Sequence, residues 1–395
     1  MSDDDALMEA DAVVIGAGIF GMSIAFQLVK RGAGRVVLVD GRAPAGGNSG
    51  RTFGQVRRHY SNELTIRLAN RGFEVLNAWA DEVGVGDPGY VRTGYLLMVP
   101  EESMEACRGN VDLGRRCGVD TRLVDPDEIR EIEPLVSTER IAGGAYEPDG
   151  GFVDVTKMIL AWFAAATAGG LVSDFGSPVT GIEATEGRVT GVRTDRGSIR
   201  APVVVNAAGA WGRDLARPLG LELPVSFTRV QLAVLRQARG LPLIRTAVTH
   251  AAAGLVIRPD RGPLALVVVY DEDLGADRDA ELDPERDPGY EARVRSSLSE
   301  FVPDYADADW ESAASGVYDV TPDWHPILGW APGVEGLYLA VGWSGHGLKL
   351  APAVGEVVAD EILGRTPFVD VSPLRLERFA QGRLLRLAYG PGARA

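Results

Sequence analysis

The order of apolar and polar segments near the N-terminus predicts a strand, a helix and a second strand in close succession. Residues 12–15 are four apolar residues that lead directly into a Gly-x-Gly-x-x-Gly sequence. A mostly apolar segment then predicts a helix over residues 22–31, which Gly32 is placed to end. A second apolar run, residues 36–39, reaches Asp40. This order is typical of a βαβ unit in a parallel sheet.

Later segments continue this α/β pattern. We expect the first unit to extend to about residue 70, and a helix over residues 65–82 to lead away from it. Residues 151–220 predict a helix, a strand pair and a buried strand, and residues 337–364 predict a strand, a glycine-rich turn and a helix that starts near Pro352. The helix is expected at 156–168, the strand pair at 179–182 and 189–192, and the buried strand at 201–211.

Between these regions the pattern changes to extended strands separated by Gly, Pro and Asp. Such a pattern is typical of a largely antiparallel sheet, which we expect to form a second domain. Residues 271–288 are acidic and predict a solvated surface loop. The strands are expected at 91–100, 227–235, 254–257 and 264–270.

The N-terminal unit carries the residues of a dinucleotide-binding site. Gly16 permits a tight turn, Gly18 lets a pyrophosphate approach the backbone, and Gly21 lets helix and strand pack closely. The N-terminus of the helix offers free N–H groups to phosphate. Asp40, nineteen residues after Gly21, can accept hydrogen bonds from a ribose 2′-hydroxyl, so we expect an adenosine without a 2′-phosphate. These residues leave open whether the ligand is NAD or FAD.

Composition narrows the class of protein. With 395 residues the chain is long enough for two domains, and its net charge of −15 argues against nucleic acid and anionic membranes as partners. Cys107 and Cys117 form no C-x-x-C pair, and four scattered histidines do not suggest a metal site. The acidic N-terminus is unlike a signal peptide, and no apolar run is long enough to span a bilayer. We therefore expect a cytoplasmic protein without metal or membrane span.

Residues 339–349 contain a second glycine-rich turn between a strand and a helix. Helix N–H groups and a cation such as Lys349 would stabilise the negative charge of a reduced flavin. The alternative is an ordinary strand-to-helix turn with glycine caps. The chain has no second Gly-x-Gly-x-x-Gly sequence, which argues against NAD(P)H as the electron source and favours FAD.

Six segments carry a resemblance that runs from one end of the chain to the other. They are residues 11–40, 47–60, 151–154, 205–211, 316–323 and 342–349. With them the chain resembles the D-amino-acid-oxidase superfamily of flavoproteins, and within it the sarcosine oxidase and dimethylglycine dehydrogenase branch.

The resemblance implies an α/β (α+β) fold with a Rossmann-like FAD-binding domain and a second, largely antiparallel β-sheet substrate domain. The first would comprise residues 10–85, 150–220 and 320–395, and the second residues 86–149 and 221–319. The residues implied around the cofactor are Gly16, Gly18, Ile19, Phe20, Gly21, Asp40, Arg42, Asn48, Ser49, Val56, Val179, Ala208, Gly209, Gly342, Gly345, Gly347 and Lys349.

The reaction implied by the resemblance is transfer of a hydride from the carbon next to an amine nitrogen to flavin N5, which gives an imine that hydrolyses. In sarcosine-type members two cations hold the substrate carboxylate, and the matching residues here are Arg57 and Lys349. A guanidinium and an ammonium together can fix a carboxylate and so aim one C–H bond. The alternative for Arg57 is a structural ion pair.

Other residues near these motifs have two interpretations each. His346 can face the substrate or complete the glycine-rich turn, and Tyr270 and Tyr318 can line the pocket or serve as packing residues. A Ser344–His346 nucleophile is not expected, because the two residues lie close in sequence and no triad acid is evident.

Two departures from the family pattern carry information. Members with covalent flavin have a cysteine where this chain has Gly316, so we expect noncovalent FAD. The monomeric oxidases carry a lysine that helps to activate oxygen, and alignment gives Val267 at that position, which puts fast oxidase activity in doubt.

Two other functions stay open from the sequence. The chain can be a hydroxy-acid dehydrogenase of the same superfamily, or a flavin-bearing subunit of a larger oxidoreductase complex. The electron acceptor can be oxygen, a quinone or a carrier protein.

Overall fold

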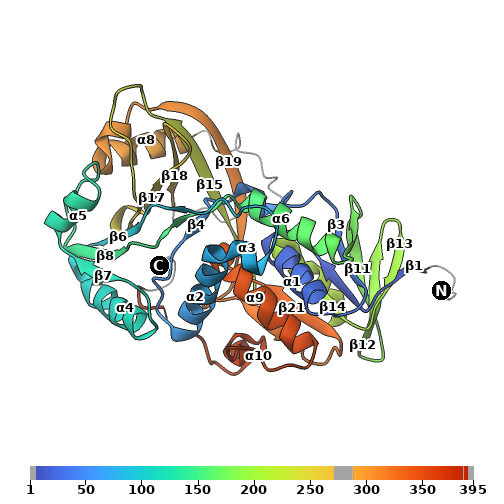
Figure 1. The fold of residues 1–395 in the computed structure, drawn as a ribbon. Coiled ribbons are helices and arrows are strands. Elements are labelled where there is room, and N and C mark those ends of the chain that lie inside the picture. The colour runs from blue at the N-terminus through green and yellow to red at the C-terminus, as the bar shows by residue number, and fades with distance from the viewer. Residues whose placement is uncertain (1–5, 271–286, 288, 386, 390–395) are drawn as a thin grey trace.

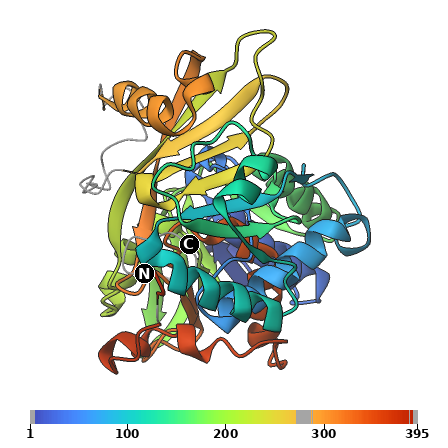
Figure 2. The same cartoon turned by 90° about the vertical axis from the view of Figure 1, so that its left-hand side faces the viewer.

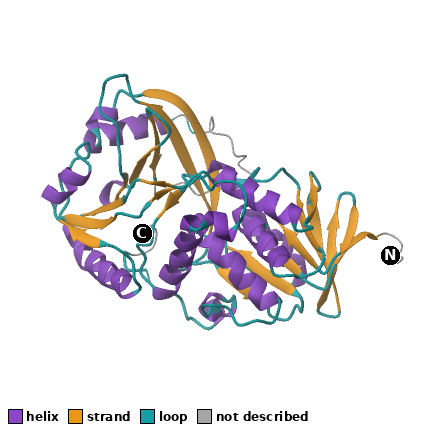
Figure 3. Ribbon diagram, in the orientation of Figure 1, coloured by secondary structure: helices purple, strands orange, loops and turns teal. Residues whose placement is uncertain are grey.

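The computed structural model describes residues 6–270, 287, 289–385 and 387–389. Figure 1 shows two parts side by side, one built around a parallel sheet and the other around a larger curved sheet. Strand β1 (Ala6–Glu9), the first described element, lies at the far edge of the first part (Figures 1 and 3).

The first part contains a six-stranded sheet whose strands come from distant regions of the chain. Neighbouring strands are parallel except for the last pair, β21 and β20, which is antiparallel. The carboxyl ends of β2 and β14 therefore meet at one edge, as in nucleotide-binding sheets. In spatial order the strands are β10 (Val172–Phe175), β3 (Val36–Asp40), β2 (Ala12–Ile15), β14 (Val204–Asn206), β21 (Leu337–Val341) and β20 (Ile327–Trp330).

Both faces of this sheet are buried. On one face, Val14 and Leu38 pack into the core formed with helices α1 (Ile19–Lys30), α6 (Val155–Ala168) and α9 (Gly347–Ile362). On the other face, alternate residues of the same strands pack against a four-stranded sheet. Apolar residues on both faces explain why these strands read as continuous apolar runs.

The four-stranded sheet contains the strand pair that we expected within the α/β layer. That expectation is wrong, because β11 (Val179–Thr185) and β12 (Arg188–Thr194) pair with β13 (Gly197–Arg200) and β1 (Ala6–Glu9) in a separate sheet. Ile182, Val189 and Val192 point toward the six-stranded sheet. A hairpin with one apolar face buries that face by packing it on the neighbouring layer.

The second part is an eight-stranded sheet, and the largely antiparallel sheet predicted from the sequence is confirmed. Only the contact between β16 and β6 is parallel. Its order is β19 (Asp309–Val320), β15 (Ser226–Arg236), β18 (Leu264–Val269), β17 (Leu255–Pro259), β16 (Ala247–His250), β6 (Tyr95–Val99), β8 (Gly143–Glu147) and β7 (Arg122–Val124). A three-stranded ribbon of β4 (Gln55–Val56), β9 (Gly151–Phe152) and β5 (Val91–Arg92) completes the strands of the described chain.

Helices cover the outer side of the eight-stranded sheet. Helix α8 (Tyr290–Phe301) and helix α5 (Pro126–Ile132) bury apolar side chains against this side, whereas helix α4 (Met104–Arg116) packs on the opposite face, against Leu97 and Val99 of β6 (Figure 2). The acidic segment predicted at 271–288 lies almost entirely outside the described residues.

Several helices differ in extent from their predictions. Helix α1 begins at Ile19, directly after the glycine turn, and the long helix predicted at 65–82 is two helices, α2 (Glu63–Asn77) and α3 (Trp79–Glu82). Helix α9 begins at Gly347 with Pro352 inside it, whereas we expected its start near that proline. The shorter helices α7 (Gly212–Ala216) and α10 (Glu377–Ala380) were not predicted.

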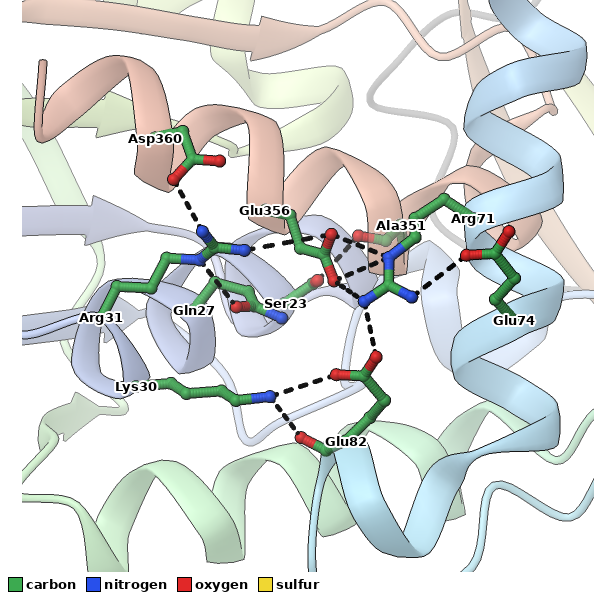
Figure 4. A network of polar contacts seen from close by, with 10 residues as sticks. All are labelled: Ser23, Gln27, Lys30, Arg31, Arg71, Glu74, Glu82, Ala351, Glu356 and Asp360. Carbon is green, nitrogen blue, oxygen red and sulfur yellow. Dashed lines mark hydrogen bonds and ion pairs between the residues drawn. The ribbon is translucent and has the colours of Figure 1, made fainter. Parts of the chain in front are cut away.

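A polar network fixes helix α9 against helices α1, α2 and α3 (Figure 4). The guanidinium of Arg71 donates to both carboxylate oxygens of Glu356, at 2.7 and 2.9 Å, and also pairs with Glu82. Arg31 pairs with Asp360 at 2.6 Å. Such bidentate, charge-assisted bonds orient the helices as well as stabilise them.

Contact between α2 and the start of α9 is also close. A Cβ atom on Gly72 would lie 2.2 Å from the carbonyl oxygen of Lys349, so only glycine permits this approach. The network and this contact together fix the N-terminus of α9, where the candidate site is found.

Candidate active site

A continuous cavity of about 1550 Å³ runs between the two parts of the molecule. It begins at the carboxyl ends of β2 and β3, passes the N-termini of α1 and α9, and reaches the inner face of the eight-stranded sheet. Pockets for small ligands are typically about 300–1000 Å³, so this cavity has room for a long cofactor and a substrate together.

Asp40 organises the nucleotide end of the cavity. Its carboxylate accepts one hydrogen bond from the Ala17 N–H, at 2.7 Å, and one from the Arg42 N–H, at 2.8 Å. Burial raises the pKa of Asp40 above 3.8, while these two backbone bonds oppose the rise. Each carboxylate oxygen keeps acceptor capacity for a ribose hydroxyl.

The turn before α1 is built for close approach. Gly16 has φ +103°, and a Cβ atom there would lie 2.5 Å from the carbonyl oxygen of Ala207 at the end of β14. The Ile19 N–H donates to Ser49 Oγ at 3.0 Å, which joins the start of α1 to the loop that follows β3. Bare backbone at a helix N-terminus is a site for a pyrophosphate.

The second glycine-rich turn also borders the cavity and packs against the start of α1, where the rings of Trp343 and Phe20 stack. Gly345 has φ +80°, and a Cβ atom there would lie 2.6 Å from the ring of Tyr318. The side chain of Asp319 accepts from the Gly342 N–H at 2.7 Å, and burial raises the pKa of Asp319 to about 6. The N-terminus of α9 therefore faces the cavity, and the hydrogen bond to Asp319 fixes the turn that precedes it. These two bare-backbone turns border the same cavity, and together they offer N–H groups for the pyrophosphate and for the flavin of one FAD molecule.

Two buried cations meet beyond the second turn. Arg57 and Lys349 both line the cavity, and each contacts the ring of Tyr60, with the guanidinium carbon 4.6 Å and the ammonium nitrogen 5.9 Å from the ring centroid. His346 lies edge-on to the same ring at 5.5 Å. The three residues that the sequence proposed for catalysis therefore surround one buried tyrosine.

The proximity of the two cations affects Lys349. Burial, and after it the charge of Arg57, lowers the pKa of Lys349 well below 10.5. A carboxylate bound between the two cations would oppose both effects, because it stabilises the charged form of the lysine. This pair is therefore suited to an anionic group.

The neighbouring arginine, Arg58, makes structural contacts within the protein instead. Arg58 is ion-paired with Asp149, lies near Glu147 and stacks on Phe73. It does not line the cavity. Of these two neighbouring arginines, Arg57, which the resemblance had singled out, lines the cavity, whereas Arg58 does not.

The position aligned with the oxygen-activating lysine needs a correction. Val267 points away from the cavity, into the core formed with Tyr290 and Val294 of α8. The next residue, Val268, lines the cavity together with Leu232 and Val256. Successive side chains of a strand face opposite sides of the sheet. An alignment error of one residue therefore assigns the side chain to the wrong face. The residue that faces the cavity here is still apolar.

Most residues proposed around the cofactor line this cavity. Three lie behind its wall. Gly21 packs against the carbonyl oxygen of Gly16, Val56 is part of the hydrophobic core, and Gly342 begins the turn beside Thr321. Those that line it are Gly16, Gly18, Ile19, Phe20, Asp40, Arg42, Asn48, Ser49, Val179, Ala208, Gly209, Gly345, Gly347 and Lys349.

The structure brings in two residues to which the sequence analysis gave no role. Tyr60 is buried beneath both cations, and Tyr389, near the C-terminus, lines the cavity. Tyr60 lies within a segment that resembles the family, which was a usable signal. Tyr389 had none, since it lies outside the segments that resemble the family and is more than three hundred residues from Arg57 in sequence.

Gly316 and Tyr318 of β19 also line the cavity, beside Asn48. Neither Cys107 nor Cys117 does so. Among the described residues, no group of three or more His, Cys, Asp or Glu could hold a metal ion. No helix in the described ranges is both long and apolar enough to cross a membrane.

Comparison with known proteins gives one family. The family model described as "DAO: FAD dependent oxidoreductase" matches residues 11–361. Human mitochondrial dimethylglycine dehydrogenase is 25% identical over 391 residues, which cover 94% of this chain but 44% of that protein. The chain thus spans less than half the length of this relative.

Two further similarities cover nearly the whole of both chains. Human peroxisomal sarcosine oxidase is 29% identical over 93% of this chain and 96% of its own length. The crystal structure of L-proline dehydrogenase from P. horikoshii superposes with a TM-score of 0.87 at 26% identity, over 96% of this chain and 100% of that chain.

Proposed function

Because the chain belongs to the family of FAD dependent oxidoreductases, we propose that it binds FAD noncovalently and oxidises an amine or amino acid at the carbon next to the nitrogen. We further propose that the substrate carries a carboxylate. Sarcosine oxidase and L-proline dehydrogenase, both named for amino acids, support this choice.

The observation that carries the proposal is the pair of buried cations. Arg57 and Lys349 line one cavity and both contact the ring of Tyr60, near the N-terminus of α9. Two neighbouring buried cations repel each other, and an anion bound between them offsets that repulsion. A substrate carboxylate supplies that anion, and it leaves the rest of the substrate inside the cavity.

Each part of the chain then has a task. Asp40, Gly16 and the N-terminus of α1 would hold the adenosine and pyrophosphate, and the turn that ends at Gly347 would hold the flavin ring. When bound, FAD supplies the two-electron acceptor for oxidation of the carbon–nitrogen bond. The apolar inner face of the eight-stranded sheet, with Leu232 and Val268, would exclude water from the reacting carbon.

The same cations would prepare the amine. Oxidation requires the neutral form of the nitrogen, because its lone pair becomes part of the imine. The substrate carboxylate neutralises only one of the two cations. The positive charge of the other cation then remains beside the substrate ammonium. A nearby like charge lowers the pKa of an ammonium group, which favours the neutral amine.

The acceptor that reoxidises the flavin is proposed to be a quinone or carrier protein rather than oxygen. The inner face of β18 offers Val268 and no cation near the site, so superoxide formation would receive no electrostatic help from that strand. We also propose a cytoplasmic setting, in keeping with the acidic composition and the two free cysteines.

The experiment that tests this function is an anaerobic titration of the FAD-loaded chain with amines, amino acids and hydroxy acids. We expect amino acids to bleach the flavin absorbance and the matched hydroxy acids to leave it unchanged. Bleaching by hydroxy acids alone would favour the hydroxy-acid dehydrogenase. A flavin that no compound reduces, until a second subunit is added, would identify the chain as part of a larger complex.

A further inference from the structure

The C-terminal segment returns to the centre of the molecule and docks beside the candidate site (Figure 1). The Leu385 N–H donates to Asp323 Oδ2 at 3.2 Å, and the Ala388 N–H donates to Ser61 Oγ at 3.1 Å. Asp323 is itself fixed by two hydrogen bonds of 2.8 Å from the buried guanidinium of Arg378. The segment is therefore tied to the body of the protein at two points.

These contacts place the side chain of Tyr389 in the cavity wall. The ring packs into a small apolar cluster that includes Tyr95 and Leu97 of β6, and Leu97 lines the same cavity. The phenol oxygen lies 2.7 Å from Nε2 of His59. A ring held by packing and by a hydrogen bond forms a defined wall, since neither end of it is free to rotate.

The partner of Tyr389 connects it to the cation that we assign to substrate binding. The backbone carbonyl of His59 accepts a hydrogen bond from the Arg57 guanidinium. Burial, and after it the charge of Arg57, lowers the pKa of His59 to about 3, so its imidazole is neutral and suited to a hydrogen bond with a neutral phenol. Two hydrogen bonds thus connect Arg57 through His59 to Tyr389.

We propose that Tyr389 is a specificity-determining residue that limits the length of substrate accepted beside Arg57. The inference rests on the proposed function, because it assumes that a carboxylate binds at Arg57 and Lys349. With the carboxylate fixed there, the remainder of the substrate extends along the cavity, and Tyr389 closes part of that path. A rigid apolar wall changes kcat/KM by roughly tenfold or more for each methylene that it admits or rejects.

Three substitutions test this wall. Tyr389→Ala removes it, Tyr389→Trp enlarges it, and Tyr389→Phe keeps the ring but removes the hydrogen bond to His59. Leu384→Ala is the matched control, because Leu384 belongs to the same segment, is 52% exposed and does not line the cavity. FAD content of each purified variant reports whether the fold is kept.

Two measurements are made on FAD-loaded protein. The first is binding of straight-chain carboxylates from acetate to hexanoate, followed by perturbation of the flavin absorbance, which needs no turnover. The second is kcat/KM for glycine, alanine, norvaline and norleucine and their N-methyl derivatives. We expect Tyr389→Ala to raise the preference for the longest over the shortest member at least about tenfold in both series. Tyr389→Trp should lower the same preference, and Tyr389→Phe and Leu384→Ala should change it less than about threefold.

Equal loss of affinity for short and long carboxylates in Tyr389→Ala would overturn the inference, because it would mean that the residue only supports Arg57. An unchanged preference in both the Ala and Trp variants would overturn it as well. If Tyr389→Ala does not retain FAD, the Trp variant decides alone. A wild-type protein that binds none of the carboxylates would instead refute the proposed function, on which the inference depends.

Discussion

Replacing Lys349 by methionine removes one of the two cations and keeps nearly the same side-chain length. In the structure this lysine is 7% exposed, and Arg57, the other cation, is 3% exposed. A buried hydrogen bond to a charged group contributes about 1.5–3 kcal/mol. At 1.4 kcal/mol for each factor of ten, we expect carboxylates to bind roughly 10- to 150-fold more weakly to the variant.

The pH dependence gives a second, independent signature. The pKa of Lys349 is lowered by burial and by Arg57, and a bound carboxylate would raise it. Carboxylate affinity should therefore be constant below the pKa of the free lysine and should fall above it, because binding then requires uptake of a proton. In Lys349→Met this fall should disappear, since no group at that position titrates.

The assay is a titration with acetate or propionate, followed by flavin absorbance between pH 6 and about 10. Lys157→Met is a suitable control, because Lys157 is also the third residue of a helix but is exposed and does not line the cavity. Neutral amines should respond weakly to either change. If Lys349→Met kept both the affinity and its fall at high pH, the lysine would not bind the carboxylate, and the assignment would be abandoned.

Further predictions follow from particular contacts. Acid precipitation should leave FAD in the supernatant, since Gly316 offers no thiol in the cavity wall; yellow colour in the pellet would contradict this. Val268→Lys should speed reoxidation by oxygen about tenfold in stopped-flow measurements. Val267→Lys should instead destabilise the fold by several kcal/mol, on the order of 4, because it buries a charge against α8; the reverse result would contradict the assigned strand faces. Gly345→Ala should weaken FAD binding about tenfold by fluorescence titration, because its φ is +80° and the new Cβ would meet an aromatic ring. Arg71→Met should lower the free energy of unfolding in urea by about 1–3 kcal/mol, because it leaves a buried glutamate without its bidentate partner; no change would mean that the network is dispensable.

The cofactor end of the site was predictable because its requirements are local. Gly16 and Gly345 are needed for conformations that follow directly from neighbouring residues, and Asp40 lies at the end of a strand whose position the apolar pattern gives. Within such a unit, spacing along the chain fixes spacing in the structure. Lys349 was expected in the turn before a helix that starts near Pro352, and only the structure showed that it lies in the first turn of α9, which begins at Gly347.

The sequence alone did not decide which way a side chain points or which sheet a strand joins. The choice between Val267 and Val268 depends on which face of β18 meets the cavity, and alternation makes a shift of one residue decisive. The hairpin of β11 and β12 was recognised as a strand pair, but its sheet was not, because pairing partners are set by distant segments.

The sequence by itself determined the family and the dinucleotide turn, and its resemblance to the family predicted Arg57 and Lys349 as the pair of cations. Tertiary structure alone decided that Arg57 faces the cavity while Arg58 does not, and that Tyr60 lies beneath both Arg57 and Lys349. It also decided that Tyr389 returns to the site from the end of the described chain. The physical reason is range: backbone turns and helix starts are set by consecutive residues, whereas burial, charge pairing and the closing of a cavity depend on residues that only the folded chain brings together.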